Sequence, residues 1–176
     1  MQNHMLCVVV FALVWCPNPA WCQSSHTLEQ TSFGLEEPVE HPVPLPQAVL
    51  EKLRAETRDR ICPNSKAAKD SDDSWFAASE VTLRRGELPA LVVKAENACL
   101  RGANIGPFWV FRRSKTGYEI VLSESALGLE VLNTRTNGYR DIRLSAATAR
   151  DVLIGVYRFR NGKYTVAIKR TRPISQ

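Results

Sequence analysis

The nine residues TNGYRDIRL (136–144) place side chains that bind ligands or move protons next to one another. Tyr139, Arg140 and Asp141 follow Asn137-Gly138, a pair that readily takes the positive φ angles of a tight hairpin turn. Turn chemistry explains the Asn-Gly pair but not the three residues after it. The stretch is therefore either a functional loop or a structural turn. We expect a turn in which Arg140 and Asp141 pair and fix it against residues 101–107.

Most catalytic chemistries are excluded by composition. The histidines are His4, His26 and His41, so the rest of the chain has no histidine for acid–base catalysis, for activating a nucleophile or for binding zinc. Phosphate-loop, dinucleotide and Gly-x-Ser-x-Gly motifs are absent from the sequence. A carboxylate pair such as Glu130 and Asp141 would suit a glycoside hydrolase, but a chain with 18 acidic residues offers many such pairs. We predict a protein that is not an enzyme and has no cofactor or metal.

Arginine and aromatic residues are the remaining candidates for binding. Strand alternation places Trp109, Phe111, Tyr157 and Phe159 on one face, which we interpret as core, and Arg112, Arg158 and Arg160 on the other. Arginine pairs bidentately with carboxylates and phosphates. Surfaces that combine arginine and aromatic residues also bind single-stranded nucleic acid. We expect no nucleic-acid partner, because the N-terminus predicts export and an exported protein seldom meets nucleic acid. The predicted binding residues are Arg101, Asn104, Arg112, Arg135, Tyr139, Arg140, Asp141 and Arg158.

The N-terminus predicts export. Residues 5–16 form an uninterrupted apolar run that is too short to span a bilayer but fits the core of a signal peptide. Ala20 and Cys22 supply the small residues before a cleavage site at Gln23. A buried N-terminal strand or helix is the alternative. We expect residues 1–22 to be a signal peptide, and the product to be periplasmic or secreted with no membrane span.

Export also predicts a disulfide. Three of the five cysteines lie in the signal peptide, which leaves Cys62 and Cys99. Two cysteines in an oxidising compartment most simply form one bridge, which stabilises the fold by up to about 4 kcal/mol. A reactive thiol is the alternative, but the chain offers neither a Cys-x-x-Cys spacing nor a nearby histidine.

Residues 23–46 differ in composition from the rest. They contain four acids, no bases, and prolines at 38, 42, 44 and 46, which is typical of an acidic, Pro-rich tether. Removing those four acids from the total of 18 leaves 14 acids against 23 Lys and Arg, or about +9. The predicted single domain, residues 47–176, is therefore basic, which favours anionic partners: an envelope component or an acidic protein.

The domain is predicted to be mainly β with one N-terminal helix. The helix is expected over 47–61, opened by Pro46 and burying Val49, Leu50 and Leu53. Strands are expected, from their β-branched and aromatic alternation, at 79–83, 91–94, 108–112, 118–122, 129–132, 142–144, 153–160 and 164–169.

These strands form two similar units, at about 78–122 and 129–169. Phe111 matches Phe159, Tyr118 matches Tyr164, and Leu122 matches Ile168. A period of about 50 residues with four strands per unit indicates two antiparallel β-meanders. Two units do not close a propeller, so we expect a sandwich or open barrel with the helix packed outside. Chance similarity between two meanders is the alternative.

The segments CLRGANIGPFWVFRR, GYEIVLS, LEVLNTRTNGYRDI and YRF with GKY are together similar to a pattern in small exported bacterial proteins of unassigned function. The resemblance covers most of residues 75–168 and implies no activity. In such proteins the first hairpin is distantly like a propeller-type calcium loop. Here Arg84 and Arg85 stand where the ligand oxygens would lie, so no metal is carried over.

From the sequence we expect an exported, non-catalytic binding or envelope-associated module that uses a basic Arg/aromatic surface. Its ligand is not specified by any motif. A carboxylate-dependent glycan hydrolase and a purely structural envelope protein are the alternatives.

Overall fold

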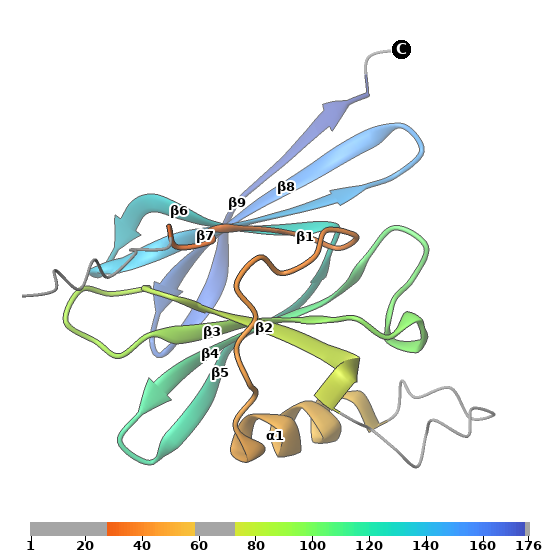
Figure 1. The fold of residues 1–176 in the computed structure, drawn as a ribbon. Coiled ribbons are helices and arrows are strands. Elements are labelled where there is room, and N and C mark those ends of the chain that lie inside the picture. Colours follow the sequence, from red (N-terminus) through yellow and green to blue (C-terminus); the bar gives the residue numbers. More distant parts are fainter. Residues whose placement is uncertain (1–27, 59–72, 175–176) are drawn as a thin grey trace, which may run out of the picture.

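The computed structural model describes residues 28–58 and 73–174, which form a mostly β fold with one α-helix, as predicted (Figure 1). In chain order the elements are β1 (Ser32–Gly34), α1 (Gln47–Thr57), η3 (Asp73–Trp75), β2 (Phe76–Val81), β3 (Ala90–Ala95), η4 (Ala98–Leu100), β4 (Gly106–Ser114), β5 (Gly117–Ala126), β6 (Gly128–Thr136), β7 (Tyr139–Ala147), β8 (Asp151–Arg160) and β9 (Lys163–Pro173). None of the helices in this part of the chain is long and apolar enough to cross a membrane.

The strands form two antiparallel sheets that do not close into a barrel. One sheet has four strands in the order β2-β3-β4-β5, and the other has five in the order β1-β6-β7-β8-β9. Each sheet thus contains one meander of consecutive strands. The predicted pair of antiparallel meanders packed as a sandwich is confirmed.

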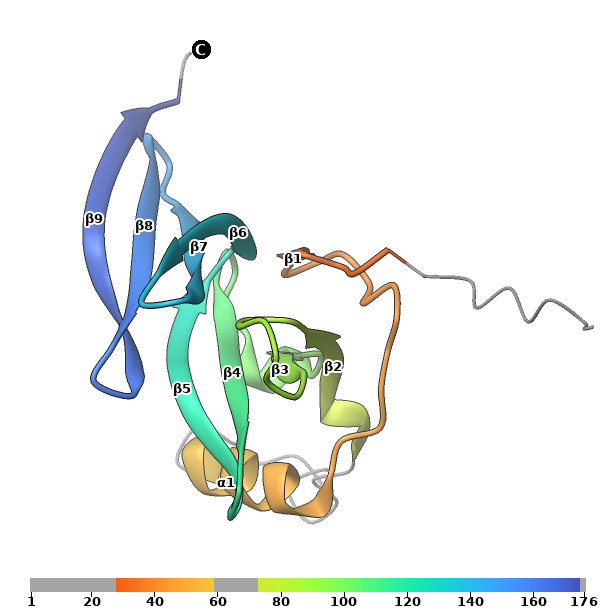
Figure 2. The ribbon, with the colours of Figure 1, turned by 90° about the vertical axis from the view of Figure 1, so that its left-hand side faces the viewer.

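The four-stranded sheet is the middle of three layers, between the five-stranded sheet and α1 (Figures 1 and 2). In β4, Phe108 and Val110 pack toward the five-stranded sheet, whereas Trp109 and Phe111 pack toward α1. A strand buried on both faces loses its polar alternation, which explains the apolar run GPFWVF (106–111). The helix buries Val49, Leu50 and Leu53 against this middle layer.

The β4–β5 and β8–β9 hairpins share one register. Each has a two-residue turn and a bulge after the fourth residue pair from that turn. Counting from the turns matches Tyr118 with Tyr164 and Phe111 with Tyr157. The sequence-based match of Phe111 with Phe159 is therefore wrong by two residues. Tyr157 and Phe159 are both aromatic, and only the pairing of the strands shows which of them corresponds to Phe111.

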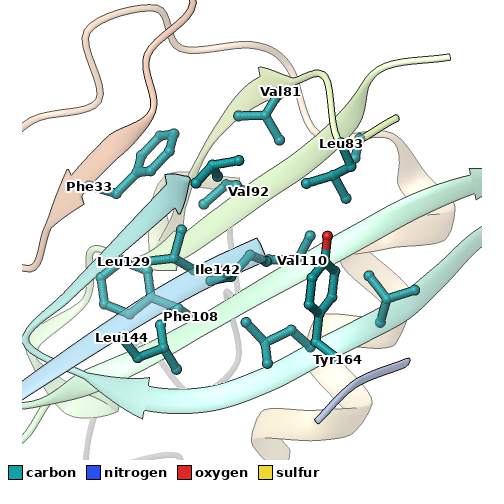
Figure 3. Close-up of a cluster of buried hydrophobic side chains, with 14 of the residues drawn as sticks. Phe33, Val81, Leu83, Val92, Phe108, Val110, Leu129, Ile142, Leu144 and Tyr164 are labelled. Carbon is teal, nitrogen blue, oxygen red and sulfur yellow. The ribbon is translucent and has the colours of Figure 1, made fainter. Parts of the chain in front are cut away.

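The acidic tether prediction is wrong for residues 28–46, here called the N-terminal segment. Residues 32–34 form β1, which pairs with β6, and Phe33 and Leu35 are only 2% and 1% exposed. Figure 3 shows Phe33 beside Leu129 and Val92 in the core between the sheets. The proline content suits this segment because it runs extended past the sheet edges, where few ladder hydrogen bonds are required.

Two buried cations hold the N-terminal segment. The Nζ of Lys94, in β3, donates to the carbonyls of Gly34 and Leu35, both at 3.3 Å, and to that of Glu37. Arg140, in β7, forms a 2.7 Å ion pair with Glu29. Lys94 belongs to one sheet and Arg140 to the other, so the segment connects the two sheets along their edge.

Some predictions concern residues outside the described ranges. These are the signal peptide (1–22), the last residues of the predicted helix (59–61) and Cys62. Cys99 lies in η4, and the Cys62–Cys99 bridge stays a prediction.

Phe33→Ala is expected to lower the free energy of unfolding by about 3–5 kcal/mol, because it leaves a cavity between the sheets. Leu28→Ala, in the same segment but 88% exposed, is the control and should change it by less than about 0.5 kcal/mol. Urea denaturation measures both. Equal, small effects would show that the segment is a tether after all.

Candidate functional site

Strand β8 separates aromatic from basic side chains. Phe159 is buried in the core between the sheets and Tyr157 packs against that core. Successive residues of a strand point to opposite faces, so Arg158 and Arg160 point away from the core. The predicted separation of aromatic and arginine side chains holds in this strand.

The neighbouring strands add cations to the same side of the five-stranded sheet. Arg143 is opposite Val156, Arg170 opposite Ile154, Arg172 opposite Val152, and Lys163 opposite Arg160. Residues opposite each other in antiparallel strands share a face. We call these six residues the outer basic face: Arg143, Arg158, Arg160, Lys163, Arg170 and Arg172.

This face is open. In Figure 2 the four-stranded sheet and α1 lie on one side of the five-stranded sheet. The outer basic face alternates with core residues such as Phe159, so it points to the opposite side. A shallow hollow of about 470 Å³ lies at one margin of this face, between β1 and the start of β8. Arg143 and Arg172 are the two residues of the face that line it, together with Val152 and Ile154. The face thus combines an apolar floor with cations that reach into solvent.

Few acids oppose these cations. Arg143 forms an ion pair with Glu130, and Arg158 lies 4.0 Å from the carboxylate of Asp141. Within the described ranges, the other four cations of the face have no carboxylate partner. By contrast, the cations elsewhere that belong to ion pairs, such as Arg84, Lys94 and Arg112, each have a glutamate. Cations without an ion pair among the described residues also lie elsewhere, such as Arg85 and Lys115, but these four share one open side of the β8–β9 hairpin.

The predicted motif around Tyr139 forms a separate aromatic and arginine cluster. The Tyr139 hydroxyl donates to Glu87 at 2.7 Å and accepts from Arg112 at 3.2 Å. Its ring stacks on Phe159 at 3.9 Å between centroids, and the Arg84 guanidinium lies 5.2 Å from its centroid. Tyr139 is a predicted binding residue, but it is only 4% exposed and its ring already stacks on Phe159, so the ring is not free to stack on a ligand.

The prediction that Arg140 and Asp141 pair with each other is wrong, because each side chain binds other groups. Arg140 donates to the carbonyls of Val131 and Leu132 at 2.9 and 2.8 Å, and Asp141 accepts from Thr134 at 2.9 Å. These partners lie where the β6–β7 register shifts between 131 and 135. Both residues therefore satisfy polar groups of one irregular stretch of β6, which is a structural role.

The turn also contacts a different loop from the one predicted. The backbone N–H of Arg140 and the side chain of Arg135 both donate to the carbonyl of Leu83, in the β2–β3 connection. Arg101, in the predicted neighbouring loop, instead donates to the carbonyl of Leu35 at 3.0 Å. Asn104 is exposed in that loop. The prediction that residues 101–107 hold the turn is wrong.

The eight predicted binding residues therefore do not form one site. Arg112, Arg135 and Tyr139 lie around the turn, Arg140 and Asp141 stabilise β6, and Arg158 alone belongs to the outer basic face. Sequence reasoning missed the other contributions of β7 and β9 to that face. The sequence does contain one indication of these residues, because Arg170 and Arg172 are two positions apart and so share a face of a strand. That this is the face of Arg158 and Arg160 follows only from the pairing of β9 with β8.

The carboxylates suggested for a hydrolase serve other contacts. Glu130 pairs with exposed Arg143 and lines the hollow described above, whereas Asp141 is 4% exposed, binds Thr134 and does not line that hollow. Two carboxyl groups must flank one substrate bond for glycoside hydrolysis. In the described part of the chain, no group of three or more His, Cys, Asp or Glu side chains is arranged to hold a metal ion.

Among the groups with shifted pKa values, the Arg112–Glu119 pair and Tyr164 lie next to the Tyr139 cluster. The Arg112 guanidinium, 2.7 Å from Glu119, lowers the pKa of that carboxyl, and the carboxylate in turn raises the pKa of Arg112. Burial raises the pKa of the Tyr164 hydroxyl, with nearby Asp141 adding to the effect. That hydroxyl donates to the Arg140 carbonyl at 2.7 Å, so it must stay protonated for the contact to persist.

Arg140→Met is expected to lower the free energy of unfolding by about 3 kcal/mol, because it leaves Glu29 and two carbonyls without their donor. Arg143→Met in the same strand removes an exposed pair and should cost less than about 1 kcal/mol. Urea denaturation of both variants tests the buried role. A similar cost for both would contradict it.

Tyr164 is expected to make the protein sensitive to alkali. Its pKa is higher in the folded than in the unfolded state, so its contribution is complete below about pH 10 and declines as the pH rises beyond that value, where the unfolded chain ionises first. Tyr164→Phe should be less stable than the wild type at pH 8 but lose less stability between pH 8 and about 11. Parallel pH profiles would refute this assignment.

No family model, curated protein or solved structure matches this chain.

Proposed function

We propose that the protein is an exported, non-catalytic binding module that holds an anionic component of its compartment on the outer basic face. The observation that carries this proposal is the concentration of cations without carboxylate partners on one open side of the five-stranded sheet. Isolated surface cations are ordinary. A row of them on neighbouring strands, with the acids of the chain used elsewhere, favours a ligand that supplies the missing negative charge.

The geometry of the face favours a ligand with repeated anionic groups. Cations two residues apart in a strand are separated by about 6.6 Å, and neighbouring strands by about 4.8 Å. Arg158 and Arg160 form one such pair in β8, and Arg170 and Arg172 form another in β9. Arg170 is opposite Ile154, four residues from Arg158, so the two pairs are about 13 Å apart along the hairpin. Arginine can bind two oxygens of one phosphate, sulfate or carboxylate group, so several anionic groups can be held at once.

The expected export and the absence of histidines from the basic domain support the same assignment. An exported basic module meets anionic envelope polymers, lipid head groups or acidic proteins rather than nucleic acid. The residues once considered for hydrolysis, Glu130 and Asp141, are engaged in contacts that a binding module can keep permanently.

A charge variant tests the proposal. The triple change Arg160→Gln, Lys163→Gln and Arg170→Gln removes exposed cations of the face without touching the core. It is expected to weaken binding to dextran sulfate about 100-fold at low salt, and to reduce the dependence of binding on salt. Isothermal titration at two salt concentrations measures both quantities.

The matched control removes three exposed cations elsewhere: Lys52, Arg85 and Lys115, each replaced by Gln. It alters the net charge equally and should weaken binding less than about threefold. Equal losses in the two triple variants would show a general charge effect and no site. Absence of wild-type binding to both dextran sulfate and anionic vesicles would refute the proposed function.

A further inference from the structure

One end of the five-stranded sheet extends beyond the rest of the molecule. In Figures 1 and 2 the end of β7, the start of β8 and the end of β9 reach past the four-stranded sheet, next to the C-terminus. We call residues 147–155 and 169–174 the projecting end. Backbone hydrogen bonds join its strands and its turn: the N–H of Thr148 donates to the Asp151 carbonyl, and the N–H of Ile174 donates to the Arg150 carbonyl, both at 2.8 Å.

The projecting end is apolar on both faces. Val152, Leu153 and Ile154 are consecutive, so Leu153 points to the inner side of the sheet and the other two to the outer side. Such a run is typical of a strand covered on both faces. Yet Leu153 is 42% and Ile174 46% exposed, and Val152 and Ile154 are only partly buried. None of the described residues completes the cover.

An apolar groove of about 240 Å³ lies on the inner side of the projecting end. Leu153, Tyr157 and Val166 line it from the β8–β9 hairpin, and Leu144 lines it from β7. Tyr157 folds over Gly155, where a Cβ would meet the ring at 3.0 Å. The groove is open and is smaller than the pockets that enclose whole ligands. It is therefore suited to part of a larger apolar molecule, such as a hydrocarbon chain that lies along it.

Cations surround these apolar residues. The projecting end contains one acid, Asp151, and four cations: Arg150, Lys169, Arg170 and Arg172. Its net charge is therefore +3. None of the four cations has a carboxylate partner among the described residues. The same charge on a second copy would repel it, so a symmetric contact between two projecting ends is disfavoured.

We propose that the projecting end inserts shallowly into the surface of an anionic lipid layer. This inference rests on the proposed function and names the source of the negative charge. Leu153 and Ile174 would enter the boundary between head groups and acyl chains, as the apolar faces of interfacial helices do. The four long cationic side chains would extend to the lipid head groups, each adding an electrostatic contribution.

The exposed apolar residues favour lipid over a soluble polyanion or an acidic protein. A sulfated or phosphorylated polymer uses the cations but leaves Leu153, Ile174 and the groove uncovered. An acidic protein needs a matching apolar surface of fixed shape, whereas the groove and both faces of the strand pair expose apolar groups in several directions. A lipid layer is deformable and covers all of them at once.

Vesicle sedimentation tests the inference with the protein as exported, residues 23–176, so that the apolar run 5–16 does not bind lipid itself. Wild type is expected to bind vesicles of phosphatidylcholine with phosphatidylglycerol and not vesicles of phosphatidylcholine alone. The double change Leu153→Gln and Ile174→Gln should weaken binding to the anionic vesicles about tenfold or more, because less apolar surface leaves water. Its binding to dextran sulfate should stay that of the wild type.

The chain offers a matched control in Leu88→Gln and Ile105→Gln, which replaces the same residue types at positions 63% and 41% exposed outside the projecting end. This control should bind the anionic vesicles like the wild type. Equal vesicle binding by the Leu153/Ile174 variant would overturn insertion. Binding of the wild type to dextran sulfate without binding to anionic vesicles would overturn the lipid assignment and leave the proposed function standing; binding to neither would overturn both.

Discussion

The arrangement of the molecule depends on the binding of an acidic segment by two buried cations. Burying Lys94 or Arg140 alone would be prohibitive, since a charge without partners is strongly disfavoured in a protein interior. Lys94 has three carbonyls and Glu96, and Arg140 has Glu29 and two carbonyls. The N-terminal segment supplies most of these acceptors. By binding one cation from each sheet, it closes the edge of the sandwich and brings Phe33 into the core.

The same contacts explain where the positive charge remains. The segment's acids and the glutamates of the four-stranded sheet and its loops compensate the cations at that end of the molecule, such as Arg84, Arg101 and Arg112. From Ile142 to the C-terminus the chain has Asp151 as its one acid. The β8–β9 hairpin, furthest from the N-terminal segment, therefore keeps its cations exposed to solvent. Folding thus places this acid-poor hairpin at the opposite edge of the five-stranded sheet from β1 of the acidic segment.

The local patterns predicted most of the strands and both meanders because alternation, turn residues and apolar runs are local properties. They failed at Phe33 and Leu35, because the acidic, proline-rich segment around these residues has the composition of a tether. Two buried apolar side chains are nevertheless enough to anchor the segment in the core. Tyr139, Arg140 and Asp141 looked functional for a related reason. Their partners, Glu87, Glu29 and Thr134, are 52, 111 and 7 residues away, so the sequence does not show that their hydrogen-bonding groups are already used.

The uncovered apolar residues of β8 are more informative about function than the motif TNGYRDIRL. In TNGYRDIRL the side chains of Asn137, Tyr139, Arg140, Asp141 and Arg143 each have a partner within the fold. In Val152-Leu153-Ile154 the sequence has the composition of a covered strand, and the structure leaves it at a projecting end beside cations that also lack partners. Exposed apolar area is unfavourable in water, and neighbouring like charges repel one another. A ligand that is both apolar and anionic removes both costs at the projecting end.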